Sequence, residues 1–280
     1  MSENIPKTGS AQTWLEFVAN KPNFPSLTHR WMLLLNNLAI KTPANEHDHV
    51  GHLIMSAIVM SCLDINDIMT LSYHDSSIGA HKLLRSLYER IVTIKYISEH
   101  PEQADRYIEF DSIDTQKIMD AIRAKSGIEM EEKPKKNLEL AAELARKRYK
   151  QKSCPTCKAQ KPISWTSMNS KDMADHVGLG HMYFYAFLVA TKQIHPTHWG
   201  AKALLSSSST FSTLNSTHEL IVQLVLIHRR HFAKAFGVTP MMNRAINDFL
   251  AAWTISEGSF DGLLSKTYTS SADDKPVYYG

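Results

Sequence analysis

The sequence is poor in residues that break helices and in cysteines that crosslink secreted domains. Its 280 residues include 11 glycines, 11 prolines and three cysteines. An odd number of cysteines, of which only Cys154 and Cys157 lie close together, does not form the disulfide framework of a secreted domain. The scarcity of glycine and proline, and the lack of the alternating pattern of a β-sandwich, favour helices.

Long hydrophobic runs and a targeting pattern are also missing. The first ten residues, MSENIPKTGS, lack the basic and then apolar pattern of a signal peptide. The most apolar run, residues 52–63, has about half of the roughly 20 residues that span a bilayer, and two aspartates follow it. We therefore expect a cytoplasmic protein without a membrane partner.

The net charge is low as well. A formal charge of +3 is too small to indicate nucleic-acid binding by the whole surface, so such a function must rest on local clusters. Hydrophobic residues make up 43% and charged residues 21%, which is typical of a globular chain that can bury a core.

Helix-capping and helix-ending residues recur along the chain and predict an all-α, multi-helix bundle. The predicted main helices cover residues 45–71, 78–98, 101–127, 135–151, 181–194 and 211–236. The predicted organisation is an N-terminal helical extension (1–44), a main bundle (45–258) and a flexible tail (259–280). One irregular loop, within residues 152–169, contains the Cys154-x-x-Cys157 pair.

Two stretches resemble a bacterial family of unknown function, the one numbered 5677. The first is HKLLRSLYERIVTIKYISEHPEQADRYIEF, residues 81–110, with an Arg-Ser-x-x-Glu helix, a Pro-Glu step and a Tyr-x-x-Phe helix. The second runs from Trp165 through Tyr183 and Tyr185 to His195, with Thr191 where the family has a serine. The resemblance spans roughly residues 50–236 and implies a helical fold, but no activity.

Helical HEPN nucleases are similar to such families only in architecture. Their motif, an arginine followed after four to six residues by a histidine, does not occur in this sequence. This departure weakens a direct transfer of ribonuclease activity.

Three polar residues form a stripe on the predicted helix 78–98. His81, Arg85 and Glu89 are spaced at i, i+4 and i+8, at the edge of the apolar face. In the functional interpretation Arg85 binds a phosphate or carboxylate and His81 transfers a proton. In the structural interpretation Arg85 and Glu89 pair with each other or tie the helix to its neighbour.

A second candidate is His195, which precedes Pro196 at the end of the tyrosine-bearing helix. If His195 faced Arg85, the pair would make a metal-independent phosphodiester site in which histidine moves the proton and arginine stabilises charge. The alternative is that His195 only caps the helix.

A zinc site is a further hypothesis. Cys154 and Cys157 could supply half of a tetrahedral site, and His176 and His181 are the downstream partners. The alternatives are a reduced loop pair and a redox pair.

Basic residues gather at the end of the predicted helix 135–151. Between residues 144 and 163 there are seven lysines or arginines and no acid, among them Arg146, Lys147, Arg148, Lys150 and Lys152. Such a run can neutralise phosphates of a nucleic acid, or it can be a solvated basic face.

The Glu46-x-x-His49 pattern matches half of a di-iron site, but no second copy exists, so we predict a solvated helix start there. Three functional hypotheses follow for the chain: an RNA-binding or RNA-cleaving element of a bacterial defence or toxin-like system, a non-catalytic interaction module, or a nucleotide or small-molecule sensor. A homodimer through the last two predicted helices is expected as well.

Overall fold

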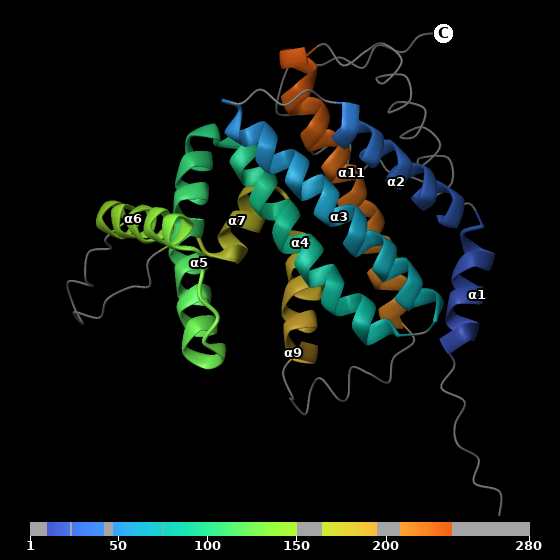
Figure 1. The fold of residues 1–280 in the computed structure, drawn as a ribbon. Coiled ribbons are helices and arrows are strands. Elements are labelled where there is room, and N and C mark those ends of the chain that lie inside the picture. Colours follow the sequence, from blue (N-terminus) through green and yellow to red (C-terminus); the bar gives the residue numbers. More distant parts are fainter. Residues whose placement is uncertain are drawn as a thin grey trace, which may run out of the picture. The chain divides into compact units, whose positions relative to one another are not determined.

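The computed structural model describes residues 10–22, 24–41, 47–74, 76–149, 164–194 and 208–236. Within these ranges all regular elements are helices, which confirms the predicted all-α, multi-helix fold (Figure 1). The chain divides into two compact units: unit 1 contains residues 1–98 and 170–280, and unit 2 contains residues 99–169.

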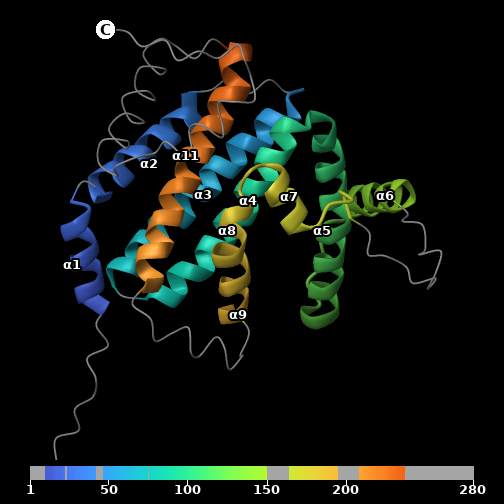
Figure 2. The same cartoon turned by 180° about the vertical axis from the view of Figure 1, so that it is seen from behind.

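Unit 1 contains the longest helices. Its elements are α1 (Ser10–Asn20), α2 (Phe24–Lys41), α3 (His49–Tyr73), α4 (Ser77–Glu99), α7 (Ser170–His176), α8 (Gly180–Met182), the π-helical segment η2 (Tyr183–Val189), α9 (Ala190–Ile194) and α11 (Ser208–Phe236). Helix α3 packs against α2 and α11, and α1 packs against α11 and α3 (Figure 2). Burial of the apolar faces of these helices supplies the main stabilisation of the unit.

The core of unit 1 is built from residues at helical spacing. Its fully buried side chains include Trp31, Leu35, Ile54, Ile58, Leu84, Ile91, Leu220 and Leu224. Most side chains of α11 between residues 213 and 228 are also buried, so this part of α11 offers little surface to the expected homodimer. The other helix predicted for that role, after residue 239, lies outside the described residues.

Helix α3 begins at His49, four residues later than the predicted helix 45–71, and Asp48 is its capping residue. The carboxylate of Asp48 accepts a hydrogen bond from the backbone N–H of Gly51 at 2.8 Å and so caps the helix. By length and composition α3 could cross a membrane, with 39% of its most apolar window buried. Core helices of soluble proteins meet the same criterion, so this is weak evidence.

The chain between α7 and α9 departs from the single helix predicted for residues 181–194. Gly178 adopts a left-handed conformation with φ +75°, and a side chain at Gly180 would collide with Asp175. After α8 the helix widens into η2 and narrows again in α9. The predicted helix start at residue 181 agrees with the start of α8, but hydrophobic periodicity did not indicate the π-helical turns.

Unit 2 is a helical hairpin formed by η1 (Pro101–Gln103), α5 (Ala104–Ser126) and α6 (Glu132–Arg148). Gly127 ends α5 in the left-handed conformation, as predicted, and donates its backbone N–H to the carbonyl of Arg123. Between the two helices Ile113, Ala142, Ala145 and Tyr149 form a small core with Phe110 beside it.

The predicted boundaries at residues 44 and 258 lie outside the described residues, as does the Cys154–Cys157 loop. The two boundaries and the loop therefore remain predictions. Helices α1 and α2, which were assigned to an extension, pack against α3 and α11 within unit 1.

Candidate anion-binding site beside the π-helical segment

Arg85 and Glu89 lie on the side of α4 that faces η2. Their side chains pair at 3.3 Å between Nη2 and Oε1, and they are 27% and 40% exposed. The Nε atom of Arg85 is buried and forms no hydrogen bond with the described residues. One arm of the guanidinium is therefore held by Glu89, while part of its hydrogen-bonding capacity is unused.

Aromatic rings of η2 support this arginine. The guanidinium carbon of Arg85 lies 4.7 Å from the ring centre of Phe187. Phe187 in turn stacks on Tyr183, with 4.9 Å between ring centres and 15° between planes. A cation on an aromatic face is oriented without neutralisation of its charge, so Arg85 can still attract an anion.

Glu89 lies in an environment that shifts the pKa of its carboxyl group above the usual value. Burial raises the pKa of its carboxyl, while the charge and hydrogen bond of Arg85 act in the opposite direction. A carboxyl group with a raised pKa can exchange a proton closer to neutral pH than an ordinary glutamate. Arg85 and Glu89 therefore place a guanidinium beside a carboxyl group with a raised pKa.

His81 lies inside the core and not at the edge of the apolar face, where its spacing placed it. The side chain is completely buried, because the ring stacks on Tyr185 at 4.4 Å between ring centres. Nε2 of His81 donates to the backbone carbonyl of Tyr185 at 3.0 Å, since a carbonyl can only accept. In this structure His81 holds α4 against η2.

Further contacts join α4 to the tyrosine-bearing segment. The hydroxyl of Tyr88 donates to the carbonyl of Leu179 at 3.0 Å. Together with the His81–Tyr185 contact, this shows that α4 and the segment from α8 to α9 run antiparallel. Tyr185 also bonds Thr213 of α11 at 3.0 Å, so η2 is fixed from two sides.

Sequence analysis missed Glu219 of α11 as a polar residue near this site. Its carboxylate is 2.7 Å from Nε2 of His181, and it contributes with Tyr183 and Asp175 to raising the pKa of Tyr88, of which burial is the main cause. Glu219 lies 38 residues from His181 in the chain, so no local spacing could indicate the pair.

The residues of the zinc hypothesis are only partly described. Nε2 of His181 is engaged by Glu219, and His176 contacts the ring of Tyr96 at 5.7 Å. Cys154 and Cys157 lie outside the described residues, and no group of three metal-binding side chains occurs among the residues that are described. The zinc site remains a prediction, and so does the role of His195, which also lies outside the described residues.

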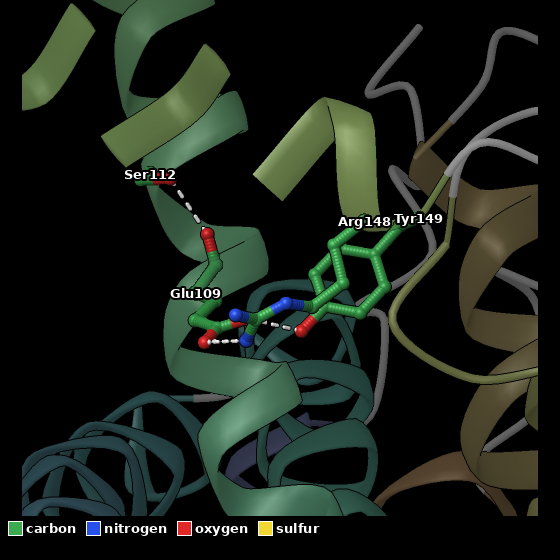
Figure 3. A network of polar contacts seen from close by, with 4 residues as sticks. All are labelled: Glu109, Ser112, Arg148 and Tyr149. Atoms are coloured by element: carbon green, nitrogen blue, oxygen red, sulfur yellow. Dashed lines mark hydrogen bonds and ion pairs between the residues drawn. The ribbon is translucent and has the colours of Figure 1, made fainter. Parts of the chain in front are cut away.

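The basic cluster begins at the end of α6 in unit 2. The carboxylate of Glu109 accepts hydrogen bonds from the guanidinium of Arg148 and from the hydroxyl of Tyr149 (Figure 3). Ser112 donates to the Glu109 backbone carbonyl at 2.6 Å, and Arg106 lies 5.1 Å from the ring centre of Tyr149. Arg148 is thus committed to a structural network.

The other basic residues of this cluster differ in their surroundings. Lys147 pairs with Glu143 at 2.6 Å on the exposed surface, where such pairs contribute little. Arg146 is half-buried. Lys150 and Lys152 lie outside the described residues. The predicted phosphate-binding residues therefore do not form one continuous free surface among the described residues.

The start of α3, at residues 48–52, is joined to another helix of unit 1. Besides capping α3, the carboxylate of Asp48 pairs with Nε2 of His231 on α11 at 2.7 Å. This contact joins two segments that are 183 residues apart in the chain.

The fold and the site define a helical protein with an arginine–carboxylate pair beside a π-helical segment. A family model described as "Family of unknown function (DUF5677)" matches residues 51–212, and the chain belongs to this family. The match covers both α4 and η2 and confirms the resemblance found in the sequence. No curated protein and no solved structure matches the chain.

Proposed function

We propose that the chain is a nucleic-acid-acting protein that binds RNA through Arg85. The carrying observation is the partly exposed guanidinium, which lies on the ring of Phe187 and pairs on one side with Glu89. Arginine in such a setting suits a phosphate group, which accepts two parallel hydrogen bonds. A role in a bacterial defence or toxin-like system would be consistent with this activity.

The same site supports a catalytic version of the proposal. Arg85 would stabilise negative charge on a phosphodiester, and Glu89, whose pKa is raised by burial, would transfer a proton. His195 is the second sequence-predicted proton-transfer residue. The reaction would be that of a metal-independent ribonuclease-like hydrolase or transferase.

Replacing Arg85 by alanine is expected to weaken RNA binding by roughly 10- to 100-fold, because a hydrogen bond to a charged group contributes about 1.5–3 kcal/mol. Fluorescence anisotropy with labelled RNA at a fixed salt concentration measures the effect. Arg85→Lys keeps the charge but loses the paired geometry, so we expect intermediate binding.

The matched control is Arg123→Ala, which removes an exposed arginine from α5 in unit 2 and should leave binding unchanged. Gel analysis of the same RNA tests cleavage, with His195→Ala as a second variant. Folded wild-type protein that binds no RNA would contradict the proposal. RNA binding without cleavage would refute the catalytic version and leave the binding function standing.

A second candidate function, a helical interaction module, is favoured by unit 2. Its buried core contains one isoleucine, two alanines and one tyrosine, and larger aliphatic side chains lie outside it. The exposed aliphatic residues of this unit are Ile108, Ile118, Ile122, Ile128, Leu140 and Leu144. Six exposed aliphatic side chains around a core of four residues indicate a partner.

A second copy of the chain suits this surface. The pairs Ile118–Ile122 and Leu140–Leu144 each occupy one face of a helix at i, i+4, so α5 of one copy can pack on α6 of the other. Helix α6 carries six basic and three acidic residues, and α5 carries five acidic and four basic ones. Two such hairpins would complete a four-helix bundle.

The double variant Ile118→Glu, Leu140→Glu is therefore expected to convert a dimer into a monomer, because it buries charge in the proposed interface. Light scattering coupled to size exclusion measures the mass. Leu63→Glu, at a similarly exposed position of α3, is the control that should stay dimeric. A wild-type monomer at high micromolar concentration would rule this function out.

A further inference from the structure

Aromatic and aliphatic side chains line the outer face of η2. Phe184 is 64% exposed and Leu188 is 38% exposed, and half-buried Tyr183 and Phe187 lie beside them in the sequence. Three of the four aromatic residues at positions 183–187 lie on this face, which gives the short segment a large accessible ring surface.

The wide turn of η2 determines which residues share this face. Tyr183 and Phe187 stack on each other, whereas Tyr185 is turned inward to His81 and Thr213. Contacts from both α4 and α11 therefore fix the segment while Phe184 points to solvent. π-Helical turns occur frequently at functional sites.

Positive charges flank the aromatic face. Arg85 lies on Phe187, and Lys82 is exposed one helical turn before Arg85 on α4. Lys192 is exposed one turn after Leu188, on α9. Because α4 and the α8–α9 segment run antiparallel, Lys82 and Lys192 lie toward the same end of this face.

We propose that this face, formed by Tyr183, Phe184, Phe187 and Arg85, binds single-stranded nucleic acid by stacking a base on Phe184 while Arg85 holds a phosphate. The inference rests on the proposed RNA-binding function and specifies its substrate class. Every base has an aromatic surface, so the binding is tolerant of sequence.

A single strand fits this surface better than a duplex. A duplex hides the faces of its bases, and its binding relies on many phosphate contacts, whereas the described residues of this face supply only Lys82, Arg85 and Lys192 as cations. One exposed ring, two half-buried rings and a few cations match the combination by which proteins bind unpaired strands.

Fluorescence anisotropy with a labelled 12-nucleotide RNA, the same sequence as a duplex, and an abasic strand of equal length tests the inference on the full chain. We expect wild-type protein to bind the single strand at least tenfold more tightly than the other two. Phe184→Ala should lose roughly tenfold in single-strand affinity, and Phe184→Tyr should retain it, since tyrosine preserves the ring.

Phe184 is exposed, so its replacement leaves the core intact, and an unchanged melting temperature verifies this. Equal affinity for the single strand, the duplex and the abasic strand, with no effect of Phe184→Ala but a loss in Arg85→Ala, would overturn the inference and keep the proposed function. No binding of any RNA by wild-type protein would overturn both. Loss of self-association in Phe184→Ala, with RNA affinity unchanged, would assign the face to a second copy and also overturn it.

Discussion

Acidification from pH 6.5 to pH 4 is expected to lower the free energy of unfolding by about 3 kcal/mol through His228 alone. His228 is 1% exposed on α11, and its ring lies 4.6 Å from that of Phe232. Burial lowers the pKa of this imidazole to about 4, and the neighbouring His231 acts in the same direction. An effect of this size is a large part of the stability of an ordinary domain.

The direction follows from where the proton binds. Between pH 6.5 and about 4 the unfolded chain protonates His228, whereas the folded protein keeps it neutral. The unfolded state therefore binds more protons, and stability falls as the pH falls. The contribution of His228 is fully present above pH 6.5 and is lost by the time the pH reaches about 4.

His218 and Asp48 also make the folded protein less stable as the pH falls. Burial, and to a smaller extent the charge of Lys21, lowers the pKa of His218 well below its usual value. Burial alone would raise the pKa of Asp48, but hydrogen bonds from His231 and from the backbone of Gly51 lower it below its usual value. The contribution of Asp48 is present above its unfolded pKa and is lost as the pH falls through the lowered folded pKa.

Urea denaturation at several pH values between 7 and 4 measures how the free energy of unfolding changes with pH. In His228→Gln the decrease in the free energy of unfolding between pH 6.5 and pH 4 should be about 3 kcal/mol smaller than in wild type, because glutamine does not titrate in this range. Because the comparison uses the change in the free energy of unfolding with pH, a destabilisation by the substitution that is the same at every pH does not affect it. The same loss in the variant and in wild type would show that His228 is not the responsible group.

Local chemistry predicted the helices of this chain well, because caps and breaks act over a few residues. Gly127 and Gly178 end helices through the left-handed conformation, and the predicted helix 78–98 agrees closely with α4. The π-helical turns of η2 were not predictable in this way. They accompany contacts with α4 and α11, which lie about 100 and 28 residues away in the chain.

The candidate site was predicted in part for the same reason. The i, i+4 spacing correctly brought Arg85 and Glu89 together, since neighbours on a helix depend only on its geometry. It did not reveal that His81 is buried under Tyr185, because the covering residue comes from a distant segment. Phe187 and Glu219 were missed because their contacts with Arg85 and His181 are tertiary.

Phe24→Ala is expected to lower the free energy of unfolding of unit 1 by about 3–5 kcal/mol, as for other buried phenylalanines. Phe24 is 1% exposed at the start of α2, and its ring stacks on His218 of α11 at 3.7 Å and 7°. It also meets Phe17 of α1 edge to face at 4.6 Å. Alanine would leave a cavity among three helices, and the melting temperature should fall by roughly 10 °C.

The shape of the melting curve decides whether residues 1–44 are an extension or part of unit 1. Hydrogen bonding between Thr28 and His218 adds a second link between α2 and α11, so we expect α2 to unfold together with the core in one transition. Leu33→Ala, at a half-exposed position of the same helix, is the control and should change stability little. If Phe24→Ala instead showed a separate unfolding transition at lower temperature, with the main transition at its wild-type temperature, α1 and α2 would be an independent extension.

The same substitution links packing to the pH dependence. With Phe24 removed, water can reach the imidazole of His218, and the desolvation that lowers its pKa is relieved. Phe24→Ala should therefore be less stable than wild type at pH 7 and yet lose less additional stability on acidification. A variant that is destabilised by the same amount at every pH would show that the stacking of Phe24 on His218 does not control the titration of that histidine.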